Sequence, residues 1–157
     1  MTSPVNSPEP QRPTEPPAAA LFDALVTAHA TVYGYGIVSA RSTPEDNYLV
    51  AKAIGAHREH REALLDMLAR RSVDPPLVAA GYQLPMAVDG PIDAANLAVR
   101  MENDAAVAWR AVVEQTDDHD ERAYAVSALT QCAVNAAFWK QTLKIWPVTT
   151  AFPGGTE

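Results

Sequence analysis

The middle of the chain, residues 72–91, interrupts a helical pattern and decides how the helices on either side can be arranged. Prolines and glycines recur from Pro75 to Pro91, and neither residue type continues a helix well. An extended chain covers at most ~3.3–3.6 Å per residue, so this segment can span roughly 65–70 Å. A helix of about 27 residues is only about 40 Å long. The segment can therefore run the length of a helix bundle, and we expect it to set the next helix parallel to the preceding one.

The segments on either side of this crossover favour helices. The hydrophobic fraction of 48% comes largely from Ala, Leu and Val, and the sequence lacks the β-branched runs bounded by turns that indicate strands. Apolar residues recur at intervals of three and four over residues 18–40, 45–71, 92–115 and 118–146. In the last of these helices we expect the inward-facing residues to be Val126, Thr130, Val134 and Phe138.

Short links at residues 41–46 and 116–120 predict that the helices form two antiparallel hairpins. Two hairpins joined by one long crossover have the connectivity of ferritin-like bundles. The sequence therefore predicts an all-α, ferritin-like four-helix bundle over residues 18–146. Residues 1–17 hold six prolines among polar residues and are expected to be a disordered arm, and residues 147–157 a loose tail.

Charge and hydropathy restrict the partners and the location. A formal net charge of −7 argues against binding nucleic acid or an anionic membrane, because both need a basic face. The sequence shows neither a signal peptide nor an apolar run long enough to cross a membrane, so we expect a cytoplasmic protein. The single cysteine, Cys132, cannot form an intramolecular disulfide and is expected to be a small buried apolar residue.

The second predicted helix carries an unusual polar stretch at residues 55–62. Its inward stripe places His57, and then His60 or Arg61, where a buried helix normally carries Leu or Ala, with further arginines and glutamates interleaved. The third helix adds a carboxylate, Glu102, beside its own apolar stripe. The sequence thus predicts polar groups on or beside the buried face at mid-bundle.

At this point the chain resembles a bacterial ferritin-like domain family of unknown function. The resemblance covers about residues 18–146 and rests on four motifs: AHATVYGYG at 28–36, HREHR at 57–61, AAGYQLP at 79–85 and LAVRME at 97–102. It implies the bundle fold and no established activity. Through the wider group of di-iron ferritin-like proteins, it also implies a redox centre in the bundle core that handles oxygen or peroxide.

An intact di-iron centre does not fit the sequence. Such a centre needs an inward Glu on each of two helices and a Glu-x-x-His on each of the other two. Glu102 fits, but the first helix has Ala28 and His29 where its Glu is needed, and the second has His57 in place of the Glu three residues before His60. Residues 130–135 of the fourth helix hold neither an acid nor a histidine.

Two functions remain open. The preferred one is a non-catalytic association or binding module without a cofactor, acting as a homodimer or with a protein partner. Under this first function the polar residues of the core form a buried network, with Glu102 paired to Arg58 or Arg61. The alternative is a redox or iron-handling protein that holds a single iron or zinc ion through His57, His60 and Glu102, with or without His29.

Overall fold

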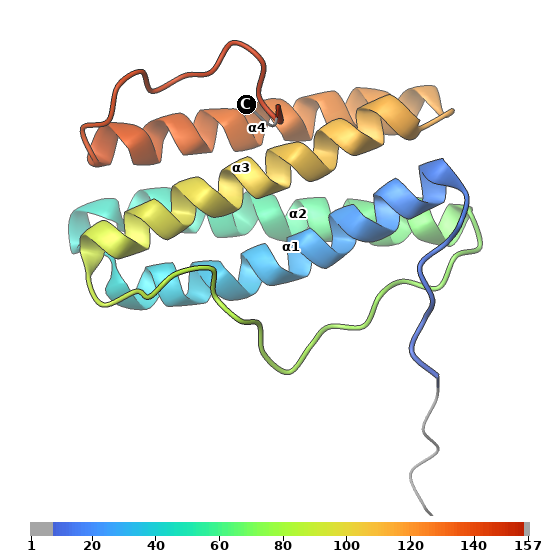
Figure 1. Ribbon diagram of the computed structural model, residues 1–157, viewed down its shortest axis with the longest axis horizontal. Helices are drawn as coiled ribbons and strands as arrows, with labels where there is room; N and C mark the ends of the chain where they lie inside the picture. Colours follow the sequence, from blue (N-terminus) through green and yellow to red (C-terminus); the bar gives the residue numbers. More distant parts are fainter. Residues whose placement is uncertain (1–7, 156–157) are drawn as a thin grey trace, which may run out of the picture.

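The computed structural model describes residues 8–155 and shows an all-α four-helix bundle, which confirms the predicted fold class (Figure 1). Residues 1–7 of the predicted arm and 156–157 of the predicted tail lie outside the described residues. A 3-10 turn, η1, precedes the second helix. In chain order the elements are α1 (Pro16–Arg41), η1 (Pro44–Asp46), α2 (Asn47–Arg70), α3 (Pro91–Gln115) and α4 (His119–Thr142).

The helices form two antiparallel hairpins, α1–α2 and α3–α4, joined by a crossover over residues 71–90 (Figure 1). The crossover runs the length of the bundle, so α3 is parallel to α2, as the sequence predicts. Tyr82 of the crossover packs against Tyr33 of α1, with ring centroids 5.4 Å apart. Around the bundle α1 contacts α2 and α3, and α4 also contacts α2 and α3. The helices α1 and α4 therefore face each other diagonally across the core, as do α2 and α3.

The inward face of α4 differs from the prediction. Val126 and Val134 are 47% and 41% exposed, and Thr130 is also exposed. Apolar residues are present on every side of α4, so periodicity alone did not fix its rotation. The centre of the observed face lies roughly 170° around the helix from the centre of the predicted one. It consists of Ala125, Ala128, Cys132, Asn135, Ala136 and Trp139.

The segments outside the bundle make contacts of their own. Arg12 of the N-terminal segment forms a two-pronged ion pair with Asp23 of α1, at 2.8 and 2.7 Å. After α4 the chain folds back along the bundle, and Gly154 lies against the backbone of α3 (Figure 1). The domain limits at residues 18 and 146 stay predictions. Within residues 8–155, no helix combines the length and the apolar character that crossing a membrane requires.

Candidate metal centre

A single carboxylate oxygen connects all four helices at the middle of the core. Glu102 of α3 is fully buried, and its Oε1 accepts hydrogen bonds from the Tyr35 hydroxyl at 2.5 Å, His57 Nε2 at 3.0 Å and Asn135 Nδ2 at 3.3 Å. These donors come from α1, α2 and α4 in turn. Each hydrogen bond to a charged group contributes about 1.5–3 kcal/mol, so Glu102 fixes the relative positions of the helices at this level.

The predicted pairing of Glu102 with an arginine is wrong. Arg61 pairs instead with its neighbour Glu62, at 2.8 Å, and Arg58 is exposed. A flexible guanidinium on α2 reaches solvent more easily than the bundle centre, where the aromatic and amide donors of the core already surround the carboxylate.

Tyr35 extends the network across the other diagonal of the bundle. Its hydroxyl donates to Glu102 and accepts a hydrogen bond from Trp139 Nε1 of α4 at 3.1 Å. Burial, and then the neighbouring Glu102 carboxylate, raise the pKa of Tyr35 well above its ordinary value. The hydroxyl therefore stays protonated, and the chain Trp139–Tyr35–Glu102–His57 crosses both diagonals of the core.

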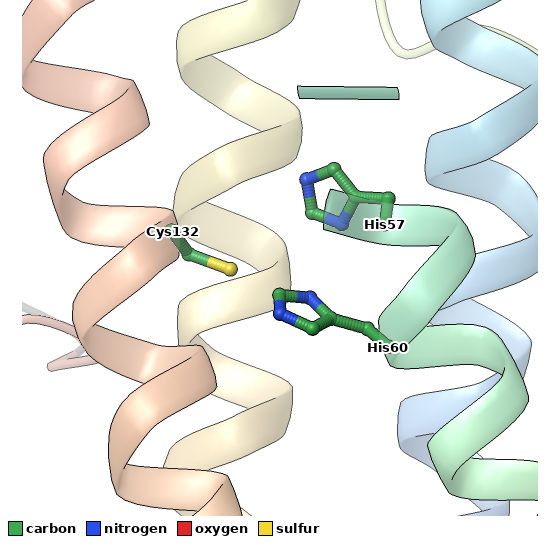
Figure 2. A group of neighbouring side chains, drawn as sticks. All are labelled: His57, His60 and Cys132. Atoms are coloured by element: carbon green, nitrogen blue, oxygen red, sulfur yellow. The ribbon is translucent and has the colours of Figure 1, made fainter. Parts of the chain in front are cut away.

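Next to this network lie His57, His60 and Cys132, which we call the histidine–cysteine group (Figure 2). The two histidines project from α2 towards α4, and the Cys132 side chain projects from α4 towards them. All three are buried, and one ligand atom of each lies within 4.8 Å of the others. Burial of Cys132 agrees with the prediction, but its neighbours are imidazoles. Burial raises the pKa of the thiol well above its usual range, and the nearby Glu102 adds to this effect.

His60 is a neutral imidazole near pH 7. Its ring packs edge-on against Trp109, with centroids 5.4 Å apart. Burial, with His57 as a second cause, lowers the pKa of His60 to about 4. Within residues 8–155, two buried side-chain atoms have no hydrogen-bond partner: His60 Nδ1 and Glu102 Oε2. Unpartnered buried polar atoms are rare in folded proteins, and each one needs an explanation.

His29, the remaining predicted ligand, does not join the histidine–cysteine group. It is buried, but its surroundings are the crossover backbone at Pro76 and the charges of Arg61 and Glu62. Burial first, and then Arg61, lower the pKa of His29. The structure thus brings together three of the four predicted residues, with His57 bonded to Glu102 and next to His60.

Residues that the sequence interpretation did not assign to the site come mainly from α4. Cys132, Asn135 and Trp139 are spaced by three and four residues, which is the signal of a shared helical face. Asn135 within an otherwise apolar stripe was a sign that this face meets a polar centre. Tyr35 belongs to the motif at residues 28–36, but the sequence interpretation gave its hydroxyl no partner.

The residues at this level do not fit a pair of irons. Two irons need four carboxylates and two histidines from four helices. The described part of the chain offers Tyr35 from α1, Glu102 from α3, and Cys132 and Asn135 from α4. With one carboxylate in reach, bridging two cations is not supported, whereas the two histidines, the thiol and the carboxylate are sufficient for one ion.

Comparisons with known proteins support the fold and name no activity. The family described as "Domain of unknown function (DUF4439)" matches residues 20–157. A solved structure, described as a conserved hypothetical protein, rv2844, from Mycobacterium tuberculosis, is 56% identical to this chain with a TM-score of 0.81. The match covers 87% of this chain and 96% of that chain. No curated protein matches the chain.

Proposed function

Since the chain belongs to the DUF4439 family, a domain of unknown function, we propose a function from its core: a ferritin-like bundle that binds one transition-metal ion. The observation that carries the proposal is the pair of buried, unpartnered atoms, His60 Nδ1 and Glu102 Oε2, beside a second histidine. Both atoms are ordinary ligands of iron and zinc. Binding an ion would satisfy groups that the surrounding protein leaves without a partner.

The residues proposed to hold the ion are His57, His60 and Glu102, from α2 and α3. His29 is left out of this set because it lies against the crossover. One ion lacks the carboxylate-bridged pair of cations on which di-iron chemistry depends. The proposed function is therefore metal binding in the core, and we propose no catalytic turnover.

Metal content of the purified protein tests this function. Protein from medium supplemented with iron and zinc is expected to carry about one equivalent of one of them by elemental analysis. His60→Gln should lose the ion, whereas His119→Gln, which changes a 94% exposed histidine, should keep it. Less than about a tenth of an equivalent of every transition metal in the wild type would contradict the proposal.

The outer face of α4 favours association as a second candidate function. Val126 and Val134 lie on one side of this helix and are about half exposed. A helix with apolar residues on every side is typical of one that is covered on every side, here by a second copy or a protein partner. Light scattering is expected to show a dimer in the wild type and a monomer in Val126→Glu. A wild-type monomer at all accessible concentrations, with no recovered partner, counts against association.

A further inference from the structure

We infer that the ion is held by the Cys132 thiolate together with His57 and His60, and that it belongs to the zinc class of borderline divalent cations. This inference rests on the proposed function that the core binds a metal ion. It goes further by adding a ligand from α4, by moving Glu102 from ligand to positioning residue and by naming the kind of metal.

The geometry of the histidine–cysteine group supports three-point ligation. The three ligand atoms lie within 4.8 Å of one another. Around a tetrahedral zinc ion, with bonds of about 2.0–2.3 Å, ligand atoms are separated by roughly 3.3–3.8 Å. Side-chain rotations that move atoms by about 1 Å close this difference. Figure 2 shows that the rings and the thiol already point towards a common space between α2 and α4.

Glu102 occupies the place of an outer carboxylate. Its Oε1 accepts a hydrogen bond from His57 Nε2 at 3.0 Å, so the proton of that ring resides on Nε2. The lone pair of Nδ1 is then free to bind an ion. In metal sites a ligating histidine almost always donates its other N–H to a carboxylate or carbonyl, which fixes the ring and its tautomer. Tyr35 and Asn135 hold the carboxylate in turn.

His60 supplies an acceptor that the protein does not use. Its Nδ1 has no hydrogen-bond partner within residues 8–155, and the residue is 6% exposed. The same ring packs edge-on against Trp109 and lies 5.5 Å from the His57 ring, which holds it in the group. An ion bound at this nitrogen supplies the partner that it lacks.

The ligand set decides the class of metal. Thiolates bind soft and borderline ions such as zinc, and imidazole suits zinc, whereas hard cations prefer oxygen ligands. Three protein ligands leave a fourth position of the tetrahedron to another group. The Cys132 thiol loses its proton to the solvent when the ion binds, and no electron is transferred in this step.

Cobalt substitution tests the inference on the unmodified protein. Because Cys132 is the single cysteine, a sulfur-to-cobalt charge-transfer band in the near ultraviolet identifies this residue as a ligand without any variant. Cobalt(II) chloride is added without other thiols, both to the folded protein and during refolding from urea, because the group is buried. The expected result is this band together with intense visible bands of a tetrahedral ion, both lost when zinc is added.

Variants separate a ligand from a positioning residue. Cys132→Ser, checked for folding by circular dichroism, is expected to lose the charge-transfer band, and His119→Gln is expected to match the wild type. Glu102→Gln should keep the band while its cobalt affinity falls about 10–100-fold.

Three outcomes overturn the inference, and they differ in what they leave standing. Wild-type protein that binds cobalt without the charge-transfer band, or a Cys132→Ser spectrum identical to that of the wild type, overturns the cysteine ligand and leaves the proposed function intact. Loss of all visible cobalt bands in Glu102→Gln, with the bands retained in Cys132→Ser, would assign Glu102 as the ligand instead. No bound zinc, iron or cobalt under either loading condition removes both the inference and the proposed function.

Discussion

Replacing Tyr35 by Phe removes one oxygen atom from the middle of the core and leaves its shape unchanged. The hydroxyl donates to Glu102 at 2.5 Å and accepts from Trp139 Nε1 at 3.1 Å. The first loss is a hydrogen bond to a charged group, worth about 1.5–3 kcal/mol. The second leaves a buried indole N–H without a partner, which costs about 1–3 kcal/mol. We therefore expect Tyr35→Phe to lower the free energy of unfolding by about 2.5–6 kcal/mol.

Urea denaturation followed by far-ultraviolet circular dichroism measures this loss in metal-free protein. With a slope of about 2 kcal/mol per molar urea, the midpoint is expected to fall by about 2 M. Tyr33→Phe is the matched control, because Tyr33 lies two positions away on α1 and is 40% exposed. Removing its hydroxyl should change the free energy of unfolding by no more than about 0.5 kcal/mol.

A double-mutant cycle shows whether the unpartnered indole is the cause. In Trp139→Phe the donor is already absent, so adding Tyr35→Phe should cost about 1–3 kcal/mol less than it does alone. If Tyr35→Phe unfolds within about 0.5 kcal/mol of Tyr33→Phe, the network carries no measurable energy. That result would show that Glu102 does not fix the relative positions of the helices, and that the energies assigned to its hydrogen bonds are wrong.

Four further predictions concern pH and glycine. In chelator-treated protein, stability is expected to fall between pH 6.5 and about 4, because unfolded His60 takes up its proton near the ordinary pKa while the folded form resists. The loss reaches roughly 3 kcal/mol, and His60→Gln should flatten this part of a series of urea midpoints. Gly36→Ala, with nothing within 4 Å of the added Cβ, should stabilise by about 0.5–1 kcal/mol. In Gly34→Ala the Cβ meets Met101 Sδ, so thermal denaturation should show a loss of about 1–3 kcal/mol. Gly154→Ala, at φ +78°, should speed hydrogen exchange over residues 148–155 and leave the urea midpoint unchanged.

The fold was predictable because its main determinants are local. The segment with prolines and glycines between residues 72 and 91 separates α2 from α3 and leaves a chain long enough to return along the bundle. The side chain of Asp118 caps α4 by accepting hydrogen bonds from the backbone N–H groups of Asp120 and Glu121. This agrees with the place of Asp118 at the start of the last predicted helix. Each of these signals acts over a few residues, so the amino-acid order alone carries it.

The hydrogen-bond partners of the core could not be predicted in the same way. Glu102 was expected to meet an arginine because opposite charges were nearby in the sequence pattern. Its actual partners are Tyr35, His57 and Asn135, which lie 67, 45 and 33 positions away. Which donor reaches a buried carboxylate depends on the rotation of each helix about its axis. Spacing in the sequence leaves that rotation open when several faces of a helix are apolar.

The rotation of α4 also determines which side chains the core can offer to a metal ion. With Val126 and Val134 inward, as the apolar spacing predicts, Cys132 would face away and the core would offer only imidazole and carboxylate ligands. That set suits iron as well as zinc. With Ala128 and Cys132 inward, small side chains leave room for the histidines of α2, and a thiol joins them. A rotation of roughly 170° about the axis of a helix that is apolar on every side thus changes the expected ligand from carboxylate to thiolate, and the thiolate band in the cobalt spectrum tests that change.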